Sequence, residues 1–159
     1  MGLLAARYGV SARSRWLAAL GMVALSMLPD ADVVGFALGV PYPDPFGHRG
    51  ATHSFLFALV AGALAAIAVR TPRLALWCVA LIASHPLLDA LTDGGLGVAL
   101  LWPLSDRRFF FPWRPIPVSP IGVGFLSWRG MRVVLAELLI FSPVYALALW
   151  PRKAARLQP

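Results

Sequence analysis

Apolar residues fall in four long stretches that are separated by loops rich in proline, glycine and charge. The stretches cover residues 16–40, 54–69, 74–91 and 133–150. A helix needs roughly 20 residues to cross a bilayer, so the second stretch is short and would borrow residues from its flanks. A fifth apolar run, residues 96–104, is too short to span. The pattern predicts about four transmembrane helices and a re-entrant or interfacial loop.

The composition favours a membrane as the solvent of this fold. Apolar residues make up 59% of the 159 residues and charged residues only 13%, whereas soluble domains carry about a quarter charged residues. Lipid does not tolerate the edges of an open sheet, because their backbone groups cannot reach water. The sequence therefore predicts one all-α membrane domain over residues 1–159, an integral bundle of about four transmembrane helices.

Charge and cysteine usage narrow the range of functions. A formal net charge of +7 would suit a nucleic-acid partner, but the arginines are scattered between the apolar stretches, which is typical of the flanks of membrane helices. We therefore expect membrane lipid, and no nucleic acid, as a partner. Cys78 is the single cysteine, which excludes a disulfide framework and a cysteine-based zinc site. It lies in an apolar run, where a packed free thiol is expected.

All three histidines and several of the seven acidic residues lie in or beside the apolar stretches. An ionisable side chain is costly inside a bilayer, so such residues are functional candidates. If the chain threads up and down through the membrane, these side chains all come to the same end of the bundle. They are Asp30, Asp32, His48, His53, His85, Asp89 and Glu137.

Three short motifs contain most of these side chains. In SHPLLD (residues 84–89), the histidine and the aspartate are four residues apart and share one helix face. In LPDAD (residues 28–32), the proline could open the helix and let both carboxylates turn inward. In GHRGATHS (residues 47–54), two glycines permit a tight loop, and Thr52 or Ser54 could cap the next helix.

Imidazole and carboxylate groups together suit zinc, manganese or iron. We predict one or two divalent ions, because six ligand-type groups exceed one tetrahedral shell. Zinc is the first choice of ion. The alternative is a structural network of Asp–His and Asp–Arg pairs, and the joint placement of so many ligand types argues against it. Glu137 is equally well a ligand or an ion-pair partner of Arg129 or Arg132. The predicted ligands are Asp30, Asp32, His48, His53, His85 and Asp89.

A metal site of this kind suits a metal-dependent hydrolase, among other functions. The ion would lower the pKa of a bound water toward neutrality, and an aspartate that is not fully engaged would act as general base. Arg49 would stabilise an anionic oxygen, with help from Arg107 or Arg108. The candidate catalytic residues are Arg49, Thr52, Asp32, Arg107 and Arg108.

A site at the lipid–water boundary favours a lipid-linked or amphipathic substrate, and its arginines favour a phosphoester. The main rival is a divalent-metal or proton transporter, or a metal sensor, because intramembrane Asp and His chains also line ion pathways. A water position kept on the metal favours hydrolysis, whereas a polar path through the bundle favours transport. The clustering of ligand types argues against a third interpretation, a purely structural membrane protein.

The three motifs resemble those of the membrane-bound metal-dependent hydrolase family, the YdjM/YbcI-like inner-membrane proteins. Members share an LPDxD element, a GHRGxTHS element and an SHxxxDxxTxxG element that is followed by a tryptophan-proline or similar loop. Here these elements are residues 28–32, 47–54 and 84–95, with Trp102-Pro103 beyond. The match extends from about residue 16 to residue 137, and residues 110–120 resemble a subgroup of the family.

The resemblance implies a multi-pass protein of the bacterial inner membrane, a hydrolase activity and a metal site at the matching residues. Relatives often carry a histidine close to the N-terminus, and this chain has none before His48. Either the start is truncated or that position is dispensable.

Overall fold

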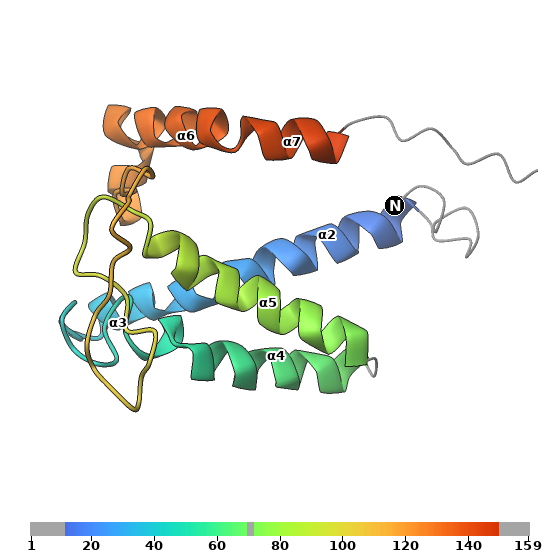
Figure 1. The fold of residues 1–159 in the computed structure, drawn as a ribbon, viewed down its shortest axis with the longest axis horizontal. Coiled ribbons are helices and arrows are strands. Elements are labelled where there is room, and N and C mark those ends of the chain that lie inside the picture. The colour runs from blue at the N-terminus through green and yellow to red at the C-terminus, as the bar shows by residue number, and fades with distance from the viewer. Residues whose placement is uncertain (1–11, 70–71, 150–159) are drawn as a thin grey trace, which may run out of the picture. The chain divides into compact units, whose positions relative to one another are not determined.

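The computed structural model describes residues 12–69 and 72–149, and these residues form helices and loops without a strand. Two isolated bridges join Thr92 to Ile116 and Val98 to Phe109. The all-α prediction is therefore confirmed for the described residues. In chain order (Figure 1) the elements are α2 (Ala12–Ser26), η1 (Leu28–Val33), α3 (Val34–Ala37), η2 (Ala51–His53), α4 (Phe55–Val69), α5 (Pro72–Asp89), η3 (Gly122–Leu126), α6 (Trp128–Ile140) and α7 (Ser142–Leu149).

The helices follow the predicted apolar stretches, with two breaks. The second and third stretches are α4 and α5. The first stretch is interrupted after Ser26, where η1 and α3 continue at 56° to α2. The fourth divides into α6 and α7 at Phe141, and its last residue, Trp150, lies outside the described residues.

One bent pair of helices in the described part of the chain is long enough to cross a membrane. Among the described residues no single helix is both long and apolar enough to cross a bilayer, whereas the bent pair Trp16–Ser26 and Leu28–Ala37 meets the requirement by length and composition. The helix Phe55–Ala65 is apolar but shorter. The bundle of four transmembrane helices stays a prediction.

The chain divides into two compact units, which are described separately. The unit Leu20–Val118 contains most of the secondary structure and all of the predicted metal ligands. The other unit includes η3, α6 and α7. In that unit the Ser127 side chain caps α6 by accepting a hydrogen bond from the Gly130 N–H group. Glu137 lies within α6 and is half-buried.

Within the unit Leu20–Val118, α4 and α5 pack closely side by side (Figure 1). Gly62 makes this possible, because a Cβ atom at that position would collide with the side chain and backbone of Val79. Ala58 and Ile82 are almost fully buried, and the free thiol of Cys78 is buried as well. The expectation of a packed free thiol is thus confirmed, and the tight helix pair fixes where the C-terminal end of α5 lies.

Non-helical segments gather at one end of this helix pair. The Phe55 N–H group donates to the Leu100 carbonyl, and the Ala99 N–H group donates to the Arg49 carbonyl. These bonds tie residues 96–104, which form turns rather than a helix, to the start of α4. Leu104 is almost fully exposed at the tip of this segment. That this segment is a re-entrant or interfacial loop stays a prediction.

Candidate metal centre

The LPDAD motif forms the 3-10 helix η1, which begins with Pro29 in its first turn. A 3-10 helix turns about 120° per residue, compared with about 100° in an α-helix. The directions of two side chains that are two residues apart therefore differ by a smaller angle on a 3-10 helix than on an α-helix. Asp30 and Asp32 both turn toward histidines as a result. This geometry agrees with the prediction that the proline opens the helix and lets both carboxylates face inward.

The GHRGATHS motif forms a compact loop that leads into η2. A Cβ atom at Gly47 would strike the Pro41 carbonyl oxygen, and one at Gly50 would strike the Pro45 carbonyl oxygen. Only glycine allows the backbone to approach so closely. Ser54, rather than Thr52, caps α4, since its hydroxyl accepts a hydrogen bond from the Phe57 N–H group at 3.0 Å.

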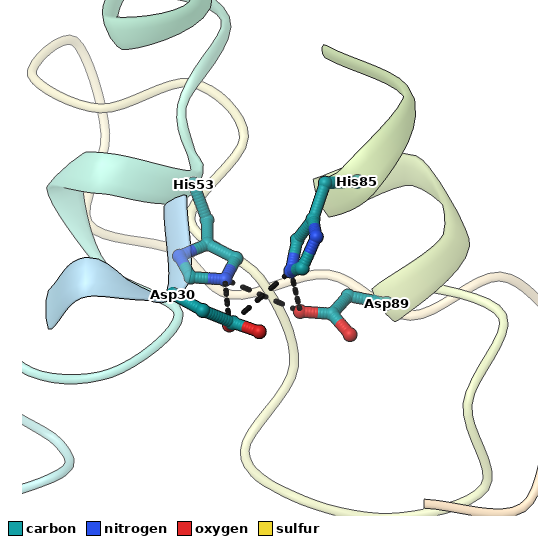
Figure 2. Close-up of side chains that lie close together, drawn as sticks. All are labelled: Asp30, His53, His85 and Asp89. Atoms are coloured by element: carbon teal, nitrogen blue, oxygen red, sulfur yellow. Dashed lines mark ion pairs between the residues drawn. The ribbon is translucent and has the colours of Figure 1, made fainter. Parts of the chain in front are cut away.

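Four predicted ligands converge on one point (Figure 2). Asp30 comes from η1, His53 from the end of η2, and His85 and Asp89 from the last turns of α5. Nε2 of His53 lies 3.4 Å from Oδ1 of Asp30 and 3.3 Å from Oδ2 of Asp89. Nε2 of His85 lies 3.2 Å from Oδ1 of Asp30 and 3.7 Å from Oδ2 of Asp89. All four ligand atoms lie within 4.8 Å of one another.

These spacings suit a small divalent ion. Ligand atoms about 2.0–2.1 Å from a tetrahedral zinc are themselves about 3.3 Å apart, which is close to the four distances here. Two of the atoms, His53 Nε2 and Asp89 Oδ2, are buried and have no hydrogen-bond partner among the described residues. Buried polar atoms are rarely left without a partner, and an ion between them would satisfy both. The residues present therefore fit a divalent metal.

The cluster is buried on one side and open on the other. The His53 side chain is completely buried, whereas 31% of the Asp30 side chain is exposed. His85 and Asp89 are intermediate, with 15% and 17% of their side chains exposed. Asp30 is therefore the most exposed member of the cluster, and the side of the cluster around it is called the open side.

The other two predicted ligands form an adjoining group around Asp32. Its Oδ1 atom lies 2.7 Å from Nδ1 of His48, and its Oδ2 atom lies 3.1 Å from Nδ1 of His53. Oδ2 also accepts hydrogen bonds from the Thr52 hydroxyl at 2.6 Å and from the Arg49 N–H group at 3.2 Å. With His48 and His53, Asp32 offers ligand atoms for a metal, but its oxygens are already well supplied with partners. Thr52 thus contacts both Asp32 and, with its hydroxyl 3.1 Å from Nδ1, the predicted ligand His53.

Burial opposes protonation of His53, but the negative carboxylates around its ring outweigh that effect. Asp30 and Asp89 face Nε2, and Asp32 faces Nδ1. Together they raise the pKa of the His53 imidazole to about 10. The metal-free cluster is therefore arranged to hold positive charge between its carboxylates, which is what a bound cation would provide.

Arg49 is held inside the protein by several acceptors. Its guanidinium NH2 group donates to Oδ1 of Asp89 at 2.9 Å, and its NH1 group donates to the Thr92 hydroxyl and the Gly94 carbonyl, both at 3.0 Å. Only 5% of Arg49 is exposed. The predicted role of Arg49 at an anionic oxygen stays a prediction, and the structure places its side chain on the carboxylate of Asp89, a predicted ligand.

The other two predicted arginines differ from each other. Arg108 donates to the backbone carbonyls of Tyr42, Asp44 and His48 at 3.0–3.1 Å and so fastens the loop before η2. Burial lowers its pKa from the ordinary value. Arg107 is exposed. Arg107 is thus the more exposed of the two, while Arg108 is partly buried with its guanidinium held by backbone carbonyls.

Two residues of the third motif have roles that the sequence analysis did not assign. The Thr92 hydroxyl accepts a hydrogen bond from Arg49 and donates one to the Asp89 carbonyl. Gly95 has a positive φ of 88°, and a Cβ there would lie 2.9 Å from NH1 of Arg49. Both residues belong to the SHPLLDALTDGG segment, so their place in the motif was the available signal. Glu137 belongs to the other unit, and no ion pair joins it to Arg129 or Arg132 among the described residues.

Comparison with known proteins places these observations in a family context. The sequence profile described as "YdjM inner membrane protein" matches residues 1–155. The chain is 44% identical over 124 residues to "Inner membrane protein YbcI" of Escherichia coli (strain K12), a match that covers 74% of this chain and 72% of that protein. No solved structure matches the chain significantly. Both descriptions name an inner membrane protein, and neither names a reaction.

Proposed function

Because the chain belongs to the YdjM inner membrane protein family, we propose that it is a multi-pass membrane hydrolase with one divalent metal ion bound by Asp30, His53, His85 and Asp89. Its substrate is an amphipathic or lipid-linked ester, with a phosphoester as the first candidate. The observation that carries the proposal is the pair of buried, unpartnered atoms, His53 Nε2 and Asp89 Oδ2, which face each other at 3.3 Å.

One ion, rather than two, agrees best with the hydrogen bonds. A second ion would need Nδ1 of His53 and an oxygen of Asp32, and both atoms already have partners there. A carboxylate that accepts from one ring nitrogen of a histidine commonly orients the other nitrogen toward a metal. Asp32 therefore acts as an orienting residue, and His48 supports Asp32. Zinc suits two imidazoles and two carboxylates.

A divalent ion at this position supplies a nucleophile from water at neutral pH and polarises the scissile group. The protein must then provide an acceptor for the proton. Asp32 is poorly suited, because its two oxygens contact His48, His53, Thr52 and the Arg49 backbone. Asp30 is the most exposed carboxylate of the cluster and directs Oδ1 at both histidines. Its second oxygen is therefore the better placed proton acceptor, and Asp30 takes the general-base role.

The surroundings of the open side support an amphipathic substrate. Met27 lies three residues, about one turn of a 3-10 helix, before Asp30 and is 53% exposed. Leu88 lies three residues after His85 and is 41% exposed. Residues at such spacings are neighbours on a helix surface. An acyl or isoprenoid chain could contact these side chains while its polar ester reaches Asp30.

The decisive experiment measures the bound metal and then the activity. The protein is purified in detergent, loaded with zinc, manganese or iron, and analysed for metal content alongside His53→Ala and Asp89→Ala. Asp106→Asn, which changes an exposed loop carboxylate outside the cluster, is the matched control. We expect about one ion per chain in the wild type and the control, and a large loss in both cluster variants. If the wild type binds no divalent ion under any loading condition, the proposal fails.

Activity separates hydrolysis from the rival transporter. Metal-loaded protein is tested on phospholipids and generic phosphoesters in mixed micelles, and on metal flux in sealed liposomes. Product release that requires Asp30 and the bound ion supports the hydrolase. Metal flux that requires the same residues, without hydrolysis of any ester, supports the transporter instead.

A further inference from the structure

Arg49 lies between the metal cluster and the loop that follows α5, where Thr92 and Gly94 accept its hydrogen bonds, and its backbone has a φ of 62°, in the left-handed region. This conformation is uncommon for residues other than glycine, and it is often found at functional sites. We propose that Arg49 is a positioning residue that limits Asp89 to one ligand oxygen and thereby sets the coordination number and metal preference of the site. This inference rests on the proposed metal site.

The two oxygens of Asp89 have different partners. Oδ1 accepts the guanidinium NH2 group of Arg49 at 2.9 Å. Oδ2 points into the cluster, 3.3 Å from His53 and 3.7 Å from His85, and has no hydrogen-bond partner. A carboxylate can bind a metal through one oxygen or through both. While Oδ1 is held by Arg49, only Oδ2 is free to bind an ion.

The Arg49 side chain is not free to leave this position. Its NH1 group is held by Thr92 and Gly94, and its backbone N–H group donates to Oδ2 of Asp32. Its carbonyl accepts the Ala99 N–H group at 3.0 Å. The planar guanidinium donates in fixed directions, so turning toward an incoming anion would break the bonds to Thr92, Gly94 and Asp89 together. Arg49 therefore holds the ligand carboxylate rather than the substrate.

The expected consequence is a preference for ions that accept few ligands. Two imidazole nitrogens and two single carboxylate oxygens suit zinc, and the water needed for hydrolysis would take a fifth position. Releasing Oδ1 of Asp89 would add a sixth donor atom. More oxygen ligands and a higher coordination number favour ions such as manganese. Arg49 thus acts on metal selectivity through Asp89, without touching the ion.

Two substitutions test this role. Arg49→Gly suits the positive φ and keeps the backbone N–H group that donates to Asp32, but it removes the guanidinium. Arg49→Lys keeps the charge and loses the planar two-pronged geometry. Zinc and manganese affinities are measured by chelator competition. The coordination number is read independently from the visible absorption of cobalt(II)-loaded protein, which weakens as the coordination number rises from four or five to six.

We expect Arg49→Gly to lower zinc affinity roughly 10–100-fold and manganese affinity by less, so that the zinc-to-manganese ratio falls. The cobalt absorption should weaken at the same time, and Arg49→Lys should lie between the wild type and Arg49→Gly. Asp44→Ala is the control, because it removes a loop hydrogen bond to the Phe46 N–H group without touching the cluster. It should leave the ratio and the cobalt spectrum unchanged.

The outcomes distinguish this inference from the proposed function. If Arg49→Gly does not fold, the ratio and spectrum of Arg49→Lys decide. An unchanged ratio together with an unchanged cobalt spectrum overturns the role of Arg49, while the metal site and its hydrolysis stand. A wild-type protein that binds no metal overturns the proposed function itself. An equal fall in both affinities with the wild-type cobalt spectrum also overturns the inference, because it indicates general destabilisation.

Discussion

Nδ1 of His53 lies 3.1 Å from Oδ2 of Asp32, on the side of the ring away from the ligand cluster. The carboxylate therefore fixes the ring so that Nε2 faces Asp30 and Asp89. Orientation of this kind is common for histidines that bind metals. It divides the predicted ligands into those that would touch the ion and those that hold them in place.

Asp32→Asn tests that division. The amide can still lie beside His53 but carries no charge, so we expect metal content at saturation to stay at about one ion per chain while affinity falls roughly 10–100-fold. His53→Ala should instead abolish stoichiometric binding. Titration with zinc against a chelator measures both quantities. A loss of stoichiometry in Asp32→Asn as complete as that in His53→Ala would make Asp32 a ligand.

The raised pKa of His53 predicts a pH dependence of metal binding. In the metal-free protein the imidazole stays protonated up to about pH 10, compared with an ordinary value of 6.5. A metal binds only the neutral ring, so binding between these pH values displaces one proton from it. Zinc affinity should rise with pH by up to about tenfold per unit. Calorimetry in buffers of different ionisation enthalpy at pH 7 should detect the released proton, and affinity independent of pH from 6 to 8 would contradict this.

The same shift predicts the opposite trend for stability without metal. Because the folded-state pKa lies above the unfolded value, protonated His53 stabilises the metal-free fold fully below about pH 6.5, and this stabilisation is lost as pH rises toward 10. The thermal unfolding midpoint of metal-free protein in detergent should therefore fall between pH 7 and pH 9. The decrease should be smaller in His53→Ala.

The sequence predicted that Asp30, His53, His85 and Asp89 meet, whereas its placement of Glu137 with them stays a prediction, because Glu137 belongs to the other unit. Helical spacing places His85 and Asp89 on one face, and the proline before Asp30 marks the break that η1 makes. The sequence could not assign the separate roles of Asp30 and Asp32, because those depend on which oxygen of each carboxylate faces which ring nitrogen. Such detail is fixed by loops that close only in the folded chain.

The arginines illustrate the same limit more strongly. The sequence indicated that Arg108 was near the site and could bind an anion. Its acceptors are the backbone carbonyls of Tyr42, Asp44 and His48, some 60 or more residues earlier in the chain. Backbone acceptors leave no signature in side-chain type, so no pattern of residues could indicate them. The opening of the helix at Pro29 and the shared face of His85 and Asp89 depend on local sequence, which can be read directly.

Arg108→Ala is expected to loosen the loop before η2. Removing the guanidinium leaves three carbonyls, those of Tyr42, Asp44 and His48, without this donor. Each lost charged hydrogen bond costs about 1.5–3 kcal/mol at most, so we expect a lower unfolding midpoint and faster proteolysis within residues 41–50. Arg107→Ala, at an exposed neighbour, is the matched control. Equal behaviour of the two variants would mean that Arg108 does not fasten the loop.

Gly62→Ala tests the close packing of α4 against α5. Its new Cβ would meet both the side chain and the backbone of Val79, so the helices would have to separate at a cost of about 1–3 kcal/mol. Gly21→Ala adds the same methyl group in α2 where nothing lies within 4 Å, and alanine is the better helix former. Thermal unfolding in detergent should show a fall for Gly62→Ala and no fall for Gly21→Ala. Equal midpoints would mean that the close approach at Gly62 is not required.

Membrane topology can be tested with single cysteines, because Cys78 is the only native thiol and is buried. In a Cys78→Ala background, Asp44→Cys and Asp106→Cys lie in the two connections that up-and-down threading places on one side. Arg73→Cys lies at the start of α5, between the second and third predicted spans, and should be on the other side. Labelling of intact cells and of opened membranes with an impermeant maleimide measures this.

We expect Asp44→Cys and Asp106→Cys to react from the same side of the inner membrane and Arg73→Cys from the opposite side. That result requires an odd number of crossings between residue 44 and residue 73, and again between residue 73 and residue 106, as α4 and α5 would provide. Labelling of all three from one side would contradict the predicted crossings by α4 and α5. The cluster would then not lie at the lipid–water boundary as proposed, because that position follows only if these two helices cross the bilayer.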